Sequence, residues 1–333
     1  ELMVLIKIVH RHFLIKGFLV SFFILLSMTV LTLLAVKASA NNPLKVTALG
    51  DSITSLGGFI SIYNRYVTTD LKYVTQTNNL GIAGWTSGAL ANALTDNSTM
   101  RTSIVDSKIV LVEIGINDFF NYRGAYQSGT CGGVDNQDCL RSMVANFKTN
   151  WDRIFTQINT LVDPTKTAIR TQDIYYSVAA ADQLPTAPYN NSFPVLNFYL
   201  QQMNAYIHSS SQVRNIPVAN VHLAYNGING DENPAAKGYL LPDAIHPTTL
   251  GSTVIADELR KLGYAPLTLV CADVNGDGKV NSTDMLLVYK NFNTNSSQTN
   301  FNPTYDVNGD GKVNSIDILL MSQQFNRRCV ISP

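Results

Sequence analysis

Apolar side chains follow two different periods between residues 43 and 263 of this chain. Short apolar runs predict strands, and Lys108–Ile114 (KIVLVEI) is almost continuous, which is typical of a strand buried on both faces of a parallel sheet. From Met143 to Leu161 the apolar residues instead recur every three or four positions and predict a helix. Strands that alternate with helices over such a stretch indicate an α/β fold with a parallel sheet.

The same patterns predict the other elements of this region. Apolar runs predict four further strands, at Lys45–Leu49, Tyr73–Leu80, Thr167–Arg170 and Pro217–Val221. Helical spacing predicts a closing helix at Thr249–Leu262, with Gly263 as its stop signal. Segments rich in Gly, Asn, Pro and Tyr predict three long surface loops, at Phe119–Asp138, Ala181–Pro194 and Tyr225–Pro242.

The first forty residues have the pattern of a secretory signal. Lys7, Arg11 and Lys16 precede the apolar stretch Gly17–Val36, and the small residues Ala38-Ser39-Ala40 follow it. We therefore predict a signal peptide at residues 1–40, cleaved after Ala40, and a secreted or cell-surface protein. The apolar stretch is also long enough to cross a bilayer, so a retained membrane anchor is the alternative.

Charge and cysteine content narrow the function classes. Charged residues make up 14% of the chain and the 24 basic residues balance the 24 acidic ones, so a basic face for nucleic acid is not expected. All four cysteines follow the predicted signal, which suits an oxidising compartment. Four cysteines allow three pairings. Their positions favour Cys131–Cys139, which encloses a short loop, and Cys271–Cys329, which brackets the C-terminal segment.

A repeat in the last third of the chain indicates a second domain. Asp273–Asp284 (DVNGDGKVNSTD) recurs almost unchanged as Asp306–Asp317, and an apolar run with helical character follows each copy. The composition changes after Tyr264-Ala265-Pro266. We therefore predict one domain at residues 41–266 and a second, small domain at residues 267–333.

Each repeat has the pattern of a twelve-residue calcium loop. Such loops supply oxygens from positions 1, 3, 5, 7, 9 and 12 and need a glycine at position 6, where Gly278 and Gly311 stand. Lys279 and Lys312, at position 7, would give only their backbone carbonyls. The predicted ligands are Asp273, Asn275, Asp277, Lys279, Asn281, Asp284, Asp306, Asn308, Asp310, Lys312, Asn314 and Asp317. The alternative is a pair of Asx-rich turns that bind no metal.

With Asp at position 12, residues 273–325 resemble a type I dockerin. The resemblance implies a small all-α domain with paired calcium loops, two structural calcium ions, and a cohesin module on a scaffold or cell surface as partner. The family's partner-binding positions correspond to Ser282, Thr283, Lys290, Ser315 and Ile316. The two copies differ at Thr283 against Ile316 and at Lys290 against Gln323, which argues against two equivalent binding modes.

Four polar blocks follow predicted strands or precede the closing helix. They are Gly50–Thr54 (GDSIT), Gly81–Thr86 (GIAGWT), Gly115–Asp118 (GIND) and Asp243–Pro247 (DAIHP). A serine becomes a nucleophile when a base takes its proton, and the oxyanion that forms needs fixed donors. Because ligands bind beyond the carboxyl ends of parallel strands, these blocks belong at one site.

In this order the blocks resemble those of the SGNH, or GDSL, hydrolase family over residues 45–262. The resemblance implies a flavodoxin-like parallel sheet, with Ser52 as nucleophile and His246 as base. Asp243, three residues before His246, can fix the imidazole tautomer. The oxyanion donors would be Ser52, Gly84 and Asn117, and catalysis would need no cofactor.

Both resemblances together imply a secreted serine esterase that acts through an acyl-enzyme at Ser52. Because dockerins accompany enzymes that attack plant cell walls, we expect an acylated polysaccharide such as xylan or pectin as the substrate. One alternative is a lipase, phospholipase or thioesterase acting on lipid acyl chains. The other is a non-catalytic binding protein that retains an idle hydrolase fold.

Overall fold

The computed structural model of this chain describes residues 43–71, 75–267, 272–307 and 311–327. These residues divide into two compact units, residues 43–267 and residues 272–327. The predicted signal peptide and the predicted Cys271–Cys329 bridge lie outside the described residues. Among the helices described, none has both the length and the apolar character needed to cross a membrane.

The first unit is built on a five-stranded parallel sheet. In chain order the strands are β1 (Leu44–Gly50), β2 (Thr75–Asn79), β3 (Ile109–Glu113), β4 (Ala168–Gln172) and β5 (Val218–Ala219). Their order across the sheet is β2-β1-β3-β4-β5, and every pair is parallel. This is the flavodoxin-like order, and it confirms the predicted fold class. The strand order reverses between β1 and β3, so a crevice is expected beyond their carboxyl ends.

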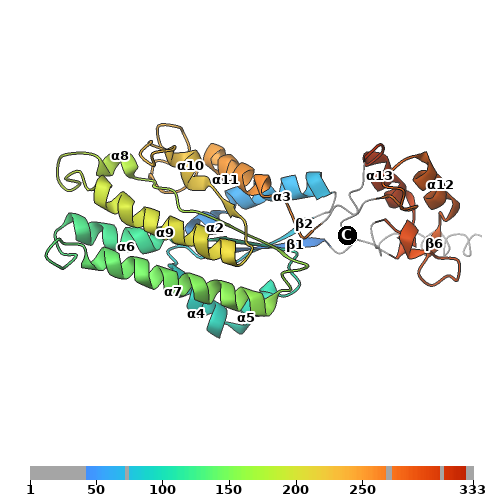
Figure 1. Cartoon of the computed structure of the whole chain (residues 1–333), viewed down its shortest axis with the longest axis horizontal. Coiled ribbons are helices and arrows are strands. Elements are labelled where there is room, and N and C mark those ends of the chain that lie inside the picture. The colour runs from blue at the N-terminus through green and yellow to red at the C-terminus, as the bar shows by residue number, and fades with distance from the viewer. Residues whose placement is uncertain (1–42, 72–74, 268–271, 308–310, 328–333) are drawn as a thin grey trace, which may run out of the picture. The chain divides into compact units, whose positions relative to one another are not determined.

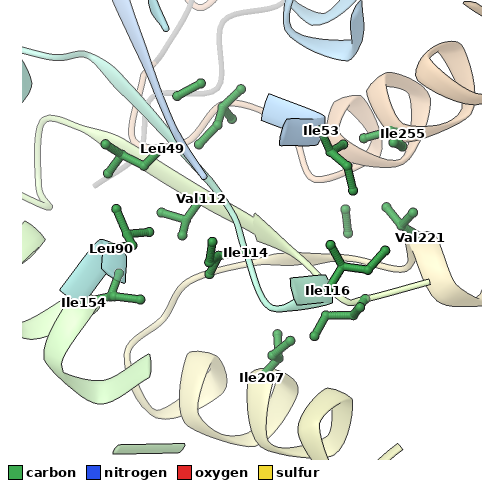
Figure 2. Packing of buried hydrophobic residues seen from close by; sticks show 14 of the residues in the cluster. Leu49, Ile53, Leu90, Val112, Ile114, Ile116, Ile154, Ile207, Val221 and Ile255 are labelled. Atoms are coloured by element: carbon green, nitrogen blue, oxygen red, sulfur yellow. The ribbon is translucent and has the colours of Figure 1, made fainter. Parts of the chain in front are cut away.

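Helices cover both faces of this sheet. Figure 1 shows α3 (Gly58–Leu71) and α11 (Thr249–Lys261) on one side, and α4 (Ser87–Asp96), α7 (Asp138–Leu161) and α9 (Phe193–Val213) on the other. In Figure 2, Leu90 and Ile154 approach the strands from one side and Ile53 and Ile255 from the other. The remaining helices of this unit are α2 (Ser52–Leu56), α5 (Ser98–Ile104), α6 (Ile116–Gln127), α8 (Ala179–Asp182) and α10 (Val221–Asn226).

The predicted loop at Phe119–Asp138 is wrong over its first half. Helix α6 runs through it to Gln127, because Phe119 is buried and packs edge-on against Tyr176, which a local sequence pattern does not reveal. Its second half is a short loop closed by a disulfide between Cys131 and Cys139. Helix α7 begins at Asp138, five residues before the predicted start at Met143.

The predicted strand at Pro217–Val221 is shorter than expected. Strand β5 has two residues, and Val221 already begins α10. The carboxylate of Asp173 accepts a hydrogen bond from the His222 N–H at 2.7 Å, which stabilises the first turn of that helix. The edge of the sheet therefore ends early because a side chain beyond β4 binds the α10 backbone.

The second unit contains two short helices, α12 (Ser282–Lys290) and α13 (Ser315–Gln323). It also contains the two-residue strands β6 (Thr294–Asn295) and β7 (Lys312–Val313), and a 3-10 turn at Pro303–Tyr305. Its small core consists of Ala272, Val280, Val288, Val307, Val313 and Met321. The last described residues of the unit pair with the first repeat. The Val280 N–H donates to the Arg327 carbonyl, and the Asn326 N–H donates to the Val280 carbonyl.

Candidate active site

Ser52 is the first residue of α2, and only Asp51 separates it from the end of β1. The Asp51 side chain caps this helix by accepting a hydrogen bond from the Ile53 N–H at 3.0 Å. Ser52 is half-buried, and its own N–H has no partner among the described residues. The hydroxyl and the N–H are therefore both available at the carboxyl end of the sheet.

Asp243, His246 and Ser52 form a continuous chain of hydrogen bonds. The Nε2 of His246 lies 2.9 Å from the Ser52 Oγ, and its Nδ1 lies 2.7 Å from Asp243 Oδ2. The other oxygen of Asp243 accepts the backbone N–H groups of Ile245 and His246 at 2.9 Å each. Burial acts to raise the pKa of Asp243, but the hydrogen bonds from His246 and Ile245 outweigh it and hold the pKa at about 2. Asp243 is thus a carboxylate at any pH at which the fold is expected to work.

Tyr175 fixes the turn that carries His246 by a hydrogen bond to its backbone. This fully buried tyrosine lies three residues beyond β4, and its hydroxyl donates to the Ile245 carbonyl at 2.7 Å. Ala244 has a φ of 58°, a left-handed conformation that costs energy in a residue other than glycine. Sequence reasoning missed Tyr175. Its position just after a strand of the parallel sheet was the available signal.

The glycine block and the GIND block are joined to each other. Gly84 has a φ of 79° in a turn closed by a hydrogen bond from the Trp85 N–H to the Ile82 carbonyl. The Asn117 Nδ2 donates to the Trp85 carbonyl at 2.9 Å, which uses one of its two amide hydrogens. The exposed Gly84 N–H has no partner among the described residues.

Asp118 and Ile82 complete these connections. The buried Asp118 carboxylate accepts both the N–H and the hydroxyl of Ser87, at 2.7 and 2.6 Å, and so fixes the start of α4 to α6. The Ile82 N–H donates to the Gly50 carbonyl at 3.0 Å, which ties the glycine block to the end of β1. The structure therefore brings Ser52, Asp243 and His246 into contact and holds the Gly84 and Asn117 segments together.

The first calcium loop folds around its acidic side chains. Asp273 accepts the N–H groups of Gly276 and Asp277 on Oδ1 and of Gly278 on Oδ2. Asp284 accepts those of Asn275 and Asn281, at 3.1 and 2.9 Å. Among the described residues, no three Asp, Glu, His or Cys side chains form a ready-made metal cluster. The donor set still suits calcium, because Asn275, Asn281 and the position-7 carbonyl add the hard oxygens that carboxylates alone do not supply.

The second loop repeats the geometry of the first where it can be compared. The Gly311 N–H donates to Asp306 and the Asn314 N–H to Asp317, as Gly278 and Asn281 do in the first copy. Asn314 and Asn281 each form a capping box with the aspartate three residues later. The predicted ligands Asn308 and Asp310 lie outside the described residues.

The predicted partner-binding residues are all exposed, at Ser282, Thr283, Lys290, Ser315 and Ile316. Apolar side chains on the same helices are also exposed. Leu286 and Leu319 occupy equivalent positions in the two copies and are 53% and 55% exposed. Tyr289 on α12 is 69% exposed, whereas the second copy has Ser322 there. The two helices therefore present similar but not identical surfaces.

Comparison with known families identifies both units. The GDSL-like lipase/acylhydrolase family matches residues 48–254. The chain belongs to this family. It is an ester hydrolase of the GDSL type, and residues 271–326 match the dockerin type I domain, so both predicted resemblances are confirmed. Dockerin type I domains typically bind calcium and imply a cohesin-type partner, and enzymes that carry them are generally extracellular or bound to the cell surface.

Solved structures of other hydrolases are similar to about two thirds of this chain. A lipase from a goat rumen metagenome is 17% identical, with a TM-score of 0.55 over 66% of this chain and 98% of that one. A variant of an acetyl xylan esterase from Geobacillus stearothermophilus is 17% identical, with a TM-score of 0.45 over 67% and 96%. A lipase/acylhydrolase from Enterococcus faecalis is 15% identical, with a TM-score of 0.45 over 67% and 97%. No curated relative matches this chain in sequence.

Proposed function

We propose that this GDSL hydrolase is a secreted serine esterase that removes acyl groups from plant cell-wall polysaccharide. The observation that carries the proposal is the hydrogen-bond chain from Asp243 through His246 to the Ser52 Oγ. In this arrangement His246 takes the Ser52 proton as Oγ attacks the ester carbonyl, and gives it to the leaving alcohol as the acyl-enzyme forms. His246 then takes a proton from a water that attacks the acyl-enzyme, and returns it to Ser52 Oγ as the free acid leaves. Asp243 holds the imidazole in the tautomer whose Nε2 faces Ser52.

The oxyanion formed in each step would be bound by three neutral donors. These are the N–H groups of Ser52 and Gly84 and the second amide hydrogen of Asn117. The first two have no partner among the described residues, and the Asn117 amide is oriented by its bond to the Trp85 carbonyl. Such donors stabilise developing charge because they already point toward it before the reaction begins.

A polysaccharide substrate is supported by the dockerin domain and by the open site. Dockerins of the kind matched here accompany enzymes that attack plant cell walls. Gly84 and Asp243 are exposed and Ser52 and His246 are half-buried, so the site has the access that a polymer chain requires. Release of acetate from acetylated xylan by wild type, and its loss in Ser52→Ala by several powers of ten, is the expected result.

A lipid ester is the second candidate, and it also has an observation in its favour. Large apolar side chains are exposed in or within four residues of three of the four blocks, at Leu56, Ile82, Leu241 and Leu250. They could contact an acyl chain. Faster hydrolysis of a long-chain p-nitrophenyl ester than of acetylated xylan would favour the lipid substrate, and the reverse would favour polysaccharide.

Covalent labelling tests whether Ser52 is the nucleophile of this hydrolase. A serine-directed phosphonate should label wild type at Ser52 and leave Ser52→Ala unlabelled, because only an activated serine attacks phosphorus at a useful rate. An unlabelled wild-type protein, or equal labelling of both proteins, would argue against Ser52 as the nucleophile.

We further propose that the dockerin domain binds two structural calcium ions through the two twelve-residue loops. Its core is too small to give much stability by burial alone, so metal binding should supply folding free energy. Calcium titration of the segment from Val270 to Pro333 should give two bound ions and a gain in helical signal that EDTA reverses. Asp273→Ala and Asp306→Ala should each remove one ion. A stoichiometry of zero would leave only a repeated turn.

The exposed faces of α12 and α13 are the proposed cohesin-binding surface, centred on Ser282, Thr283, Lys290, Ser315 and Ile316. Thr283 in the first copy corresponds to Ile316 in the second, and Tyr289 corresponds to Ser322. Because the two helices differ at these positions, we expect cohesin to bind with unequal affinity in the two orientations that the repeat would allow.

We also propose that the signal peptide is cleaved after Ala40, and sequencing the N-terminus of the secreted protein tests it.

A further inference from the structure

Two acidic side chains are buried next to Ser52, and the proposed triad uses neither. Asp51 is 0% exposed and Glu113, at the end of β3, is 5% exposed. The strand register pairs Gly50 with Glu113, so the two acids come from neighbouring strand ends. On α2, one turn from Asp51, the Thr54 hydroxyl donates to Glu113 Oε2 at 2.8 Å.

Both acids lie next to Gly50, a position at which no larger residue fits. A Cβ at Gly50 would lie 2.0 Å from the Glu113 carbonyl oxygen and 3.0 Å from its Oε2. The register of β1 and β3 places the Asp51 carboxyl beside that of Glu113, and each carboxyl affects the pKa of the other. However, the buried Asp51 Oδ2 faces no donor among the described residues. Two carboxylates only accept, so the pair can form a hydrogen bond only when one of them carries a proton.

The surroundings favour the protonated form. Burial, together with the neighbouring Glu113, raises the pKa of Asp51 well above its usual value, and burial raises the pKa of Glu113 to about 7. Beyond Glu113 lies a cavity of about 10 Å³ lined in part by Gln172 and Asp173, room for about one water. The other polar groups near the pair on the packed elements are Thr54, Asp118, Gln172, Asp173, Tyr175, Asp243 and His246.

We propose that Asp51 and Glu113 share a proton and act together as the positioning pair for Ser52. The shared proton lets the Asp51 carboxyl bind Glu113 with one oxygen while the other caps α2. The start of α2, with the Ser52 N–H and hydroxyl, is thereby fixed to the end of β3, which leads into Asn117. The importance of this position rests on the proposed function, in which Ser52 is the nucleophile.

The shared proton makes the stability of the first unit depend on pH. In the unfolded chain the two acids lose their protons near the usual values of 3.8 and 4.5, whereas the folded pair retains protons to higher pH, with the pKa of Glu113 at about 7. The folded state therefore binds more protons between these values, and its stability falls as pH rises through this window. In Glu113→Gln, the side-chain amide does not titrate. Its oxygen can accept the hydrogen bond from the Thr54 hydroxyl, and its NH₂ group can donate one to the Asp51 carboxylate.

Urea unfolding of the full chain from pH 4.5 to 8 tests this consequence. Both tryptophans, Trp85 and Trp151, belong to the first unit, so their fluorescence follows that unit alone. We expect Glu113→Gln to gain stability relative to wild type as pH rises toward 7, and Asp96→Asn, at an exposed acid, to run parallel to wild type. Parallel curves for Glu113→Gln and wild type would overturn the shared proton.

Kinetics test the positioning role. We expect Glu113→Ala to lower kcat by roughly 10- to 100-fold with little change in KM, since the pair does not touch substrate. Glu113→Gln at pH 6 should restore most of kcat, and Asp51→Asn should behave like it, because the Asn amide also caps α2 and donates to Glu113. Equal loss in Glu113→Gln and Glu113→Ala would show that the ionised carboxylate is required and would overturn the proposal.

The two proposals can fail independently. If Ser52→Ala keeps full activity, the proposed triad is wrong, while the unfolding curves still decide whether Asp51 and Glu113 share a proton. If Ser52→Ala is inactive and the unfolding curves are parallel, the triad stands and the shared proton is rejected.

Discussion

At the scale of single residues, Asn117 has two amide hydrogens with different tasks. One donates to the Trp85 carbonyl, and the other is the proposed oxyanion donor. Asn117→Ala should lower kcat by roughly 10²–10³-fold, the usual loss for one oxyanion donor. Steady-state ester hydrolysis measures kcat and KM of this variant. Asn121→Ala, on the exposed face of α6, is the control. A loss confined to KM would place Asn117 in ground-state binding instead.

Tyr175 offers a second residue-scale prediction with a matched control. Tyr175→Phe removes the hydroxyl that holds the Ile245 carbonyl beside His246, a bond worth about 0.5–1.5 kcal/mol. We expect a lower kcat and a lower unfolding free energy. The Tyr225 ring stacks on Tyr175, but its buried hydroxyl has no partner among the described residues. Tyr225→Phe should therefore keep its activity. Equal behaviour of both variants would mean that the Tyr175 hydroxyl does not position His246.

At the scale of elements, two glycines distinguish close packing from helix propensity. Gly50→Ala would force a methyl group to 2.0 Å from the backbone oxygen of Glu113. The clash would disturb the pairing of β1 with β3. We expect a loss of about 3 kcal/mol or more in unfolding free energy. Gly124 lies inside α6 with nothing within 4 Å of its Cβ position. Gly124→Ala should therefore gain about 0.5–1 kcal/mol. Urea unfolding followed by tryptophan fluorescence measures both, and a neutral Gly50→Ala would contradict the packing argument.

At the scale of the whole molecule, the segment after α11 belongs to the esterase unit. The buried Arg170 donates to the carbonyls of Gly263 and Ala265, and the Tyr264 hydroxyl donates to Asp70. A chain ending at Leu267 should keep its fold and most of its esterase activity, because no proposed catalytic residue lies beyond His246. A chain ending at Leu262 should be less stable, since a guanidinium that loses buried partners costs about 1–3 kcal/mol. Thermal unfolding and ester turnover of both chains measure the difference. Equal melting temperatures would show that this segment is dispensable.

Much of this molecule follows from local sequence. The β3 strand is predicted because Lys108–Ile114 is an almost continuous apolar run, and α7 because its apolar residues repeat at helical spacing. The four blocks mark the candidate site, because parallel strands place their carboxyl ends along one edge. The proposed calcium loops are equally local, since a single twelve-residue segment contains all of its proposed ligands.

Other features depend on side chains that are distant in sequence, and only the tertiary structure decides them. Helix α6 forms where a loop was expected because Phe119 packs against Tyr176, and β5 ends early because Asp173 binds the α10 backbone. The same holds for the contact of Tyr175 with Ile245 and for the buried pair Asp51 and Glu113. The sequence alone determined the strands, the helices α7 and α11 and the order of the candidate catalytic blocks, because periodicity and motifs are read within a short window. The packed fold decided which distant residues meet, because burial and a shared proton arise only when separate segments exclude water from one another.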